Sequence, residues 1–344
     1  MSLKILLLSN NFYPDIGGIE INSEILAQEF TRAGHQVRIV TWTEDTVDNR
    51  FPFAVVRKPG KGELFREHNW ADVVFENNPC LRLTWPNVIL GKPSVIALNT
   101  WVSRVDGKIG WQDRLKTLWF RRAKNIIAVS DALRRKNWEK AIVISNPYRA
   151  ELFRIDRSAV RNTELVFLGR LVSDKGADLA IEALHQLRRE KAPAADYRLT
   201  IIGDGPEAPV LKALVAKYGL EQQVSFTGAL RGKELVDRLN QHKLILVPSR
   251  WEEPFGNVAL EGMACGCIPV VSDGGGLPDA VGNAGLVFRR GDAADLVRCI
   301  RGIFESPALE DKLRRAAEDH LREHQPKKVA GRYLKVIREA VSRV

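Results

Sequence analysis

The chain has 344 residues, of which 45% are hydrophobic and 27% are charged, and its formal net charge is +10. These values are typical of a soluble globular protein that is long enough for two domains, each with its own core. No apolar run reaches the roughly 20 residues that a membrane-spanning helix needs, so no such helix is predicted.

The first 150 residues alternate short apolar runs with amphipathic stretches, which is typical of βαβ units with helices on both faces of a parallel sheet. The apolar part of the opening segment, residues 5–8, is too short for the core of a signal peptide and is interpreted as a buried strand. Strands are predicted at 4–9, 36–41, 53–57, 72–76, 94–98, 125–129 and 141–144, and helices at 22–33, 113–123 and 132–138.

The same alternation restarts after a segment near 146–163 that contains Pro147 and lacks strong periodicity, which indicates a linker. We therefore predict domains at 1–150 and 151–325, and an amphipathic helix at 328–343. In the second domain, strands are predicted at 164–168, 197–202, 223–226, 244–247, 268–272 and 285–288, and helices at 177–189 and 206–218.

Four cysteines occur in the chain, at Cys80, Cys265, Cys267 and Cys299. The pair at 265 and 267 lacks the spacing of a zinc site, and no neighbouring pair of histidines completes one. We interpret all four as reduced core thiols of a cytoplasmic protein.

The segment PSRWEEPFGNVALEG, residues 248–262, is the most informative motif. Its carboxylates Glu253 and Glu261 lie eight positions apart, and Pro254 and Asn257 between them suit the start of a helix. Eight helical residues rise about 12 Å and turn through about 800°, which predicts that both carboxylates share one face. A helix start favours a phosphate, and carboxylates accept hydrogen bonds from sugar hydroxyls, so the motif suits a nucleotide-sugar. The alternative is a pair of helix-surface glutamates, because this spacing is common.

Two loops that follow predicted strands add to this interpretation. In FYPDIGGIE, Gly17 and Gly18 allow the backbone to approach a phosphate, or they serve a turn that requires glycine. The loop is not G-x-G-x-x-G, so a dinucleotide-dependent oxidoreductase is not supported. In FLGRLVSDKG, Arg170 and Lys175 suit a departing diphosphate at a strand end; the alternative is an ordinary basic loop.

Together these segments resemble the E-x7-E motif, the G-R-x4-K-G motif and the N-terminal glycine loop of the retaining glycosyltransferases of family 4 (glycosyl transferases group 1). The resemblance implies the α/β GT-B fold, with two Rossmann-like domains whose parallel sheets face a cleft and a C-terminal helix, 326–344, that crosses back to the first domain. It implies a retaining hexosyltransferase that moves a sugar from a nucleotide-diphosphate sugar to a glycan, lipid-linked or small-molecule acceptor. An inactive nucleotide-sugar or glycan binding module is the alternative, and glycan phosphorylases share the fold.

The resemblance also implies roles for single residues. Glu253 would bind the transferred sugar, Glu261 the ribose hydroxyls, and Arg170 with Lys175 the leaving diphosphate. Catalytic roles thus fall on Arg170, Lys175 and Glu253, and donor binding on Gly17, Gly18, Gly169, Gly203, Gly205, Phe255, Gly256, Asn257, Val258 and Glu261. The cation pair stands in for a metal, so no metal or other cofactor is expected, and a UDP-sugar is the expected donor. The glycines of SDGGGLPDAVG, 272–282, either approach the ligand or form a structural turn.

One departure from the family concerns Asn99, which stands where many members have a histidine that contacts the donor sugar. Asparagine donates and accepts hydrogen bonds but carries no charge near neutral pH. Asn99 is therefore expected to keep the sugar contact or to have no role in it, and it is the one feature that favours the inactive alternative.

Residues 101–150 hold twelve Lys and Arg against four Asp and Glu. Such a patch suits nucleic acid, an anionic membrane or an acidic substrate, or it is a solvated helix face. We expect no nucleic acid. In 108–140, cations alternate with the apolar residues Trp111, Leu115, Leu118, Trp119 and Phe120. This pattern suits contact of a cytoplasmic protein with an anionic membrane, at the inner membrane face. The alternative is that the apolar residues pack inside the protein and the charges lie in water.

Overall fold

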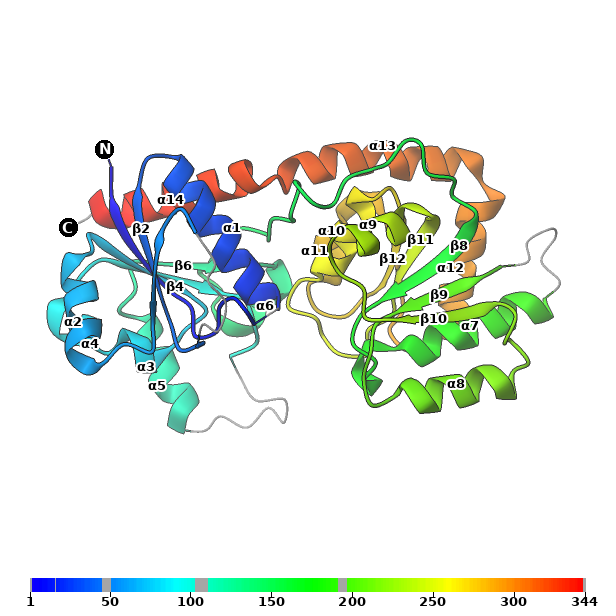
Figure 1. Cartoon of the computed structure of the whole chain (residues 1–344), viewed down its shortest axis with the longest axis horizontal. Coiled ribbons are helices and arrows are strands. Elements are labelled where there is room, and N and C mark those ends of the chain that lie inside the picture. The colour runs from blue at the N-terminus through cyan, green and yellow to red at the C-terminus, as the bar shows by residue number, and fades with distance from the viewer. Residues whose placement is uncertain (1, 16, 45–50, 103–110, 191–196, 343–344) are drawn as a thin grey trace. The chain divides into compact units, whose positions relative to one another are not determined.

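The computed structural model describes residues 2–15, 17–44, 51–102, 111–190 and 197–342, without the side chains of 111–114 and 163. The chain divides into two compact units (Figure 1). The first unit comprises Met1–Pro147 and His324–Val344, and the second comprises Tyr148–Glu323.

The first unit is built on a sheet of seven parallel strands in the order β3-β2-β1-β4-β5-β6-β7. Its central strands are buried except at Lys4, and they consist mainly of apolar residues, as strands covered on both faces do. The bounds are β1 Lys4–Leu8, β2 Gln36–Thr41, β3 Ala54–Arg57, β4 Val73–Asn77, β5 Ser94–Leu98, β6 Asn125–Ala128 and β7 Ile142–Val143.

The helices of the first unit include one from the far end of the sequence, α14, which runs beside α1 (Figure 1). Tyr333 of α14 is fully buried and meets Phe75 of β4 edge to face at 5.7 Å between ring centroids. The apolar residues of α14 between Val329 and Ala340 therefore complete the core of the first unit. The bounds are α1 Gly18–Arg32, α2 Lys61–Trp70, α3 Leu81–Thr84, α4 Pro86–Leu90, α5 Trp111–Phe120, α6 Asp131–Asn137 and α14 Pro326–Ser342.

The second unit has a sheet of six parallel strands in the order β10-β9-β8-β11-β12-β13. Its strands are β8 Thr163–Leu168, β9 Leu199–Ile202, β10 Val224–Gly228, β11 His242–Val247, β12 Ile268–Ser272 and β13 Leu286–Phe288. Its helices are α7 Ala177–Arg189, α8 Ala208–Lys217, α9 Gly232–Asn240, α10 Asn257–Ala264, α11 Leu277–Val281, α12 Ala293–Glu305 and α13 Pro307–Glu323, with short 3-10 turns at Ser173–Lys175 and Gly282–Ala284.

Two doubly wound parallel sheets confirm the predicted α/β fold class. The sequence pattern did not single out α2, α9, α12 or α13 as helices. Of α13 only Leu313 is buried, so an apolar stripe is nearly absent there. None of the described helices is both long enough and apolar enough to cross a bilayer.

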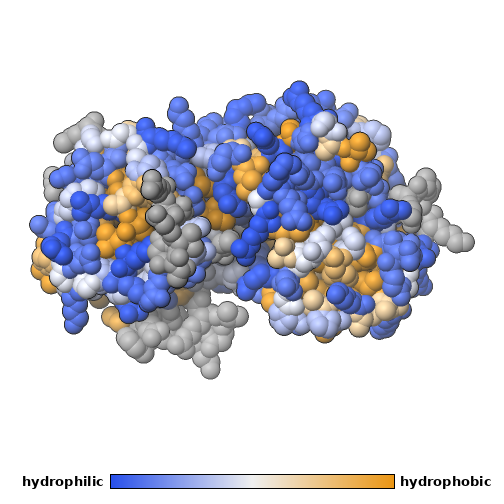
Figure 2. Space-filling view, viewed as in Figure 1, coloured by the Kyte–Doolittle hydropathy of each residue, from blue (hydrophilic) through white to orange (hydrophobic). Residues whose placement is uncertain are grey.

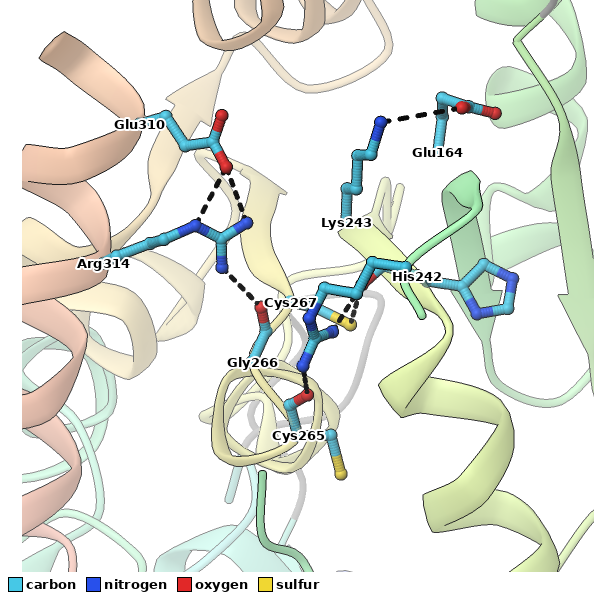
Figure 3. A network of polar contacts seen from close by, with 9 residues as sticks. Glu164, His242, Lys243, Cys265, Gly266, Cys267, Glu310 and Arg314 are labelled. Atoms are coloured by element: carbon cyan, nitrogen blue, oxygen red, sulfur yellow. Dashed lines mark hydrogen bonds and ion pairs between the residues drawn. The ribbon is translucent and has the colours of Figure 1, made fainter. Parts of the chain in front are cut away.

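Arginines hold the turn between α10 and β12 (Figure 3). Arg161 donates to the carbonyls of His242 and Cys265 at 2.7 and 2.6 Å, and Arg314 donates to the carbonyl of Gly266 at 2.9 Å. Burial raises the pKa of the Cys267 thiol to about 12, which keeps it protonated. All four cysteines are free, and Cys80 alone among them is partly exposed rather than in the core, which corrects its interpretation as a core thiol.

Candidate active site

The candidate site of the second unit lies where three neighbouring strands end. The strands β8, β11 and β12 are adjacent and parallel, so their carboxyl ends share one edge of the sheet. Open α/β sheets bind ligands at that edge. The loops after these strands, 169–176, 248–256 and 273–276, belong to the three segments that the sequence singled out, 167–176, 248–262 and 272–282.

Lys175 and Glu253 form the centre of this site. The Lys175 ammonium donates to Oε1 of Glu253 at 2.5 Å, and their side chains are only 21% and 13% exposed. The same ammonium lies 5.3 Å from the ring centroid of Trp251. The hydroxyl of Ser249 is 3.1 Å from Glu253 Oε1 and 3.0 Å from the carbonyl of Asp174. Ser249 therefore ties the loop after β11 to the loop after β8.

Ser249 is a site residue that the sequence prediction missed. Its signal was weak: a single hydroxyl two positions after a buried strand and four positions before Glu253. Serine is common in loops for reasons unrelated to ligands, so only the hydrogen bond to Glu253 distinguishes it.

The glycine-rich stretch after β12 supports the backbone of Glu253. The N–H of Gly276 donates to the Glu253 carbonyl at 2.7 Å, and Glu253 and Gly275 form an isolated parallel bridge. Gly275 has φ +64°, and a Cβ there would lie 2.2 Å from the Glu253 carbonyl oxygen. Of the two alternatives for this stretch, Gly275 thus fits the structural one, because its missing side chain lets two loops touch.

The helix α10 begins at Asn257 behind Gly256, whose φ is +124°. Glu253 therefore precedes the helix, whereas Glu261 lies inside it. The prediction that eight helical residues carry both carboxylates on one face was wrong, because the left-handed turn at Gly256 breaks the helical path. Phe255 is 2% exposed, so its side chain serves packing. The N–H of Ala259 donates to the carbonyl of the N-cap residue Gly256 at 3.0 Å, and the start of the helix carries a partial positive charge.

The surroundings of the Glu261 carboxyl group disfavour its charged form. Burial raises its pKa to about 7, and the positive charge of Arg149 opposes that rise. The group therefore titrates near neutral pH, where a small change in its surroundings shifts it between the neutral acid and the carboxylate.

The remaining residues predicted for donor binding fall into different surroundings. Arg170 is exposed, and no ion pair or hydrogen bond joins its side chain to the residues that the structure describes. A Cβ at Gly203 would lie 1.8 Å from the carbonyl oxygen of Gly169, so glycine is required at 203 where the loops after β8 and β9 touch, whereas a Cβ at Gly169 would only meet the Phe167 ring at 3.4 Å. A Cβ at Gly205 would likewise meet the carbonyl of Leu171 at 2.4 Å.

The second unit also has a hollow of about 390 Å³ between α7 and α8, where Figure 2 shows hydrophobic side chains gathered. Its lining includes Val210 and Leu214 together with the acidic residues Asp178, Glu182 and Glu207. Three carboxylates repel a diphosphate, so this hollow does not suit the donor.

In the first unit, Gly17 is the N-cap of α1 with an extended φ of −161°, and the exposed Gly18 is its first residue. Asn99 follows β5 and is 8% exposed. Its amide is bonded to Asn22 and Asn77, so the side chain predicted to contact the sugar is part of a buried polar cluster.

The fully buried Glu76, at the end of β4, is a titratable residue that the sequence analysis had not singled out. Trp119 Nε1 of α5 donates to its Oε1 at 2.8 Å, and Thr84 Oγ1 of α3 lies 3.0 Å from its Oε2. Burial raises the pKa of Glu76 to about 7, against these two hydrogen bonds. The carboxyl thereby joins α3 to α5.

The basic stretch 108–140 is described only in part, since Lys108 and the side chain of Trp111 lie outside the described residues. Within α5, Leu115 and Leu118 are 44% and 58% exposed, whereas Trp119 and Phe120 are 7% and 2% exposed. The apolar residues of this helix are therefore divided between solvent and core.

Three comparisons with known proteins bear on this site. The chain is 36% identical over 160 residues to a glycogen synthase of Mycobacterium tuberculosis, which covers 46% of this chain and 38% of that enzyme. It is 34% identical over 145 residues to the 2-deoxystreptamine glucosyltransferase of Streptomyces kanamyceticus, which covers 41% of this chain and 36% of that enzyme. The chain thus spans less than two fifths of the length of both relatives.

Among solved structures, the Anabaena protein HepE in complex with UDP superposes with a TM-score of 0.83 at 19% identity and covers 98% of this chain and all of that one. This likeness shows the GT-B fold. The family model for glycosyl transferases group 1 matches residues 149–320, half of the chain, and contains the Lys175–Glu253 pair. The protein therefore belongs to the glycosyl transferases group 1 family.

Proposed function

We propose that this protein transfers a sugar from a nucleotide-diphosphate sugar to an acceptor with retention of configuration. The observation that carries the proposal is the partly buried Lys175–Glu253 pair at the carboxyl edge of the second sheet, beside the start of α10. A cation, a carboxylate and the positive end of a helix in one place suit a ligand that combines a diphosphate with hydroxyls.

In the proposed reaction the donor separates the Lys175–Glu253 pair. The diphosphate takes the ammonium of Lys175 and the exposed guanidinium of Arg170, and hydroxyls of a hexose take the carboxylate of Glu253. Backbone groups of 255–258 hold phosphate oxygens, and Glu261 accepts the ribose hydroxyls. The two fixed cations stabilise charge on the departing diphosphate, a role that a divalent ion fills in other enzymes. We propose on this basis that no metal is required.

The donor base is proposed to be uracil, supported by the UDP bound to the Anabaena protein of the same fold. Isothermal titration calorimetry with UDP, GDP and dTDP tests this, followed by transfer assays with the corresponding sugars. Selective UDP binding with transfer supports the proposal. UDP binding without transfer to any of a panel of glycan and lipid-linked acceptors supports the inactive module, and no nucleotide binding overturns both. Turnover of a sugar 1-phosphate instead of a nucleotide-sugar identifies a phosphorylase.

We further propose that the acceptor is reached at an anionic membrane, at the cytoplasmic face. Six large apolar residues on α3, α4 and α5 and at the joint between α3 and α4 are 37–69% exposed: Leu81, Trp85, Val88, Ile89, Leu115 and Leu118. Residues 77–102 and 114–130 contain no Asp or Glu, and Arg121, Arg122 and Lys124 after α5 are exposed. Glu76 bonds to both Trp119 and Thr84, which places α3 beside α5. Apolar side chains among cations suit an anionic lipid surface.

Liposome sedimentation tests this surface. The protein is expected to bind vesicles that contain anionic lipid at low salt and to be released at high salt, because salt screens the charges. Leu118→Asp is expected to weaken binding, whereas Val210→Asp, at an equally exposed position on α8 of the second unit, leaves it unchanged. Absence of binding at low salt overturns the membrane proposal and leaves the transfer proposal intact.

A further inference from the structure

Four buried asparagines meet in the first unit near the carboxyl ends of its central strands. Asn22 lies in α1, Asn77 is the last residue of β4, and Asn99 directly follows β5. Asn146 comes just before Pro147, where the N-terminal part of the first unit ends. They are 2%, 0%, 8% and 6% exposed. An amide that is buried without hydrogen bonds costs roughly 2 to 7 kcal/mol, which favours mutual hydrogen bonds within such a cluster. Of the described residues, none hydrogen-bonds to the buried Oδ1 of Asn22.

The amides form a chain of donors that runs in one direction. Asn22 Nδ2 donates to Asn99 Oδ1 at 3.2 Å, and Asn99 Nδ2 donates to Asn77 Oδ1 at 2.8 Å. Asn22 Nδ2 also lies 3.3 Å from Asn146 Oδ1. Asn99 is the middle link, and it uses both ends of its amide.

The chain ends on the first turn of α1. Asn77 Nδ2 donates to the Ser23 hydroxyl at 2.6 Å and to the Ile19 carbonyl at 3.2 Å. Ile19 directly follows Gly17 and Gly18, the N-cap and first residue of α1. The Ser23 hydroxyl also lies 2.8 Å from that of Ser9, just after β1. The orientation of the Asn99 amide is thereby linked to the backbone at the start of α1.

We propose that Asn99 is a positioning residue that acts through Asn77 and Asn22 to hold the first turn of α1 and the Gly17–Gly18 backbone. This inference rests on the proposed function, because it assigns to Asn99 an indirect part in transfer instead of a contact with the donor sugar. The role requires one planar group that both donates and accepts, which asparagine supplies. An aspartate at the same place sets a carboxylate oxygen against Asn77 Oδ1, so two acceptors face each other.

Two aspartate variants break this chain at successive links. Asn99→Asp removes the donor to Asn77, and Asn77→Asp removes the donor to the Ile19 carbonyl. The matched control is Asn87→Asp, a 7% exposed asparagine of α4 in the same unit whose amide donates to the Lys92 carbonyl, outside the cluster. We expect the first two to lower kcat by about tenfold or more with little change in donor KM, since misplacement of a loop weakens the transition state. The control is expected to change stability alone.

Three readouts separate positioning from contact. The double variant Asn99→Asp with Asn77→Asp is expected to be no slower than either single variant, because both break one chain. Turnover of Asn99→Asp is expected to recover as pH falls, since a protonated carboxyl donates to Asn77 Oδ1 again. Hydrogen–deuterium exchange of amides in the first turn of α1 is expected to speed up in both single variants and not in the control.

A rise in donor KM with unchanged kcat in Asn99→Asp, additive with Asn77→Asp and without faster exchange in α1, overturns the proposal in favour of a direct sugar contact. The exchange measurement needs no substrate. If the wild-type protein neither binds a nucleotide nor transfers a sugar, the proposed function fails, whereas faster exchange in the two variants still shows that Asn99 holds α1. Unchanged exchange in folded variants refutes the positioning role itself.

Discussion

The ammonium of Lys175 lies 2.5 Å from the carboxylate of Glu253, although 78 positions separate the two residues. Each charge satisfies the other, and both are mostly shielded from water. A nucleotide-sugar offers each a better-matched partner, so in the proposed reaction this pair opens when the donor binds. Removal of Lys175 leaves the Glu253 carboxylate with the Ser249 hydroxyl, and removal of Glu253 leaves the Lys175 ammonium beside the Trp251 ring, and neither partner carries the opposite charge.

Lys175→Ala is expected to lower kcat by about 100- to 1,000-fold, the usual effect of removing one group that stabilises transition-state charge. Steady-state kinetics with UDP-sugars measure it. Lys233→Ala removes a lysine from another ion pair, with Asp237 on the exposed surface of α9, and is expected to leave turnover unchanged. Wild-type turnover by Lys175→Ala refutes the role of this lysine.

Glu261 gives the donor site a pH dependence. Because burial raises its pKa to about 7, the carboxyl is mostly neutral at pH 6 and mostly ionised at pH 8. Ribose hydroxyls donate more strongly to the carboxylate, so affinity for UDP is expected to fall about tenfold from pH 8 to pH 6 through this group.

Calorimetric titrations of the wild type and of Glu261→Gln at both pH values measure that effect. The ligand's own phosphate ionises in both titrations, so the difference between the two proteins isolates Glu261. Identical pH profiles for the two proteins contradict the assignment of the ribose hydroxyls to this residue.

Gly275→Ala is expected to destabilise the second unit by about 2 kcal/mol or more, because its Cβ meets the Glu253 carbonyl and its φ of +64° is unfavourable. Gly291 is the control, since its φ is +78° and a Cβ there meets nothing within 4 Å. Gly291→Ala therefore shows the backbone cost alone, about 1 kcal/mol. Thermal unfolding of both variants separates the backbone cost from the cost of the steric contact. Equal losses of stability in the two variants show that the contact at Gly275 adds no cost of its own.

Glu76 links stability to pH with a defined sign. Its pKa is raised from 4.5 to about 7 in the folded protein, so between these values the folded state holds a proton that the unfolded state has lost. The free energy of unfolding from this group is greatest below pH 4.5 and falls by up to about 1.4 kcal/mol per pH unit as pH rises toward 7.

Urea unfolding at pH 5, 6 and 7 tests this link. Glu76→Gln keeps an acceptor for Trp119 but cannot titrate. The decline in the free energy of unfolding that comes from Glu76 is therefore expected to be absent in this variant. Trp119→Phe removes one hydrogen bond to the carboxyl and keeps the carboxyl itself, so it is expected to retain the decline. A decline in Glu76→Gln that equals that of the wild type shows that another group is responsible.

Local sequence patterns determined the fold class, because strands buried on both faces and amphipathic helices leave a periodic signal that needs no knowledge of distant residues. The helix α7 and the strands β2, β5 and β12 were predicted to the residue. Spacing alone failed at Glu253 and Glu261, since a left-handed glycine between them ends the helical path and no pattern of apolar residues records it.

The sequence by itself thus determined the fold class and the family resemblance, because helix and strand periodicity and short motifs are local properties of a chain. Only the tertiary structure decided that Lys175 meets Glu253 and that the amide of Asn99 is bonded inside a buried cluster. It also decided that Glu76 joins two helices. These are contacts across many positions, and their energies depend on burial and distance, which a linear sequence does not contain.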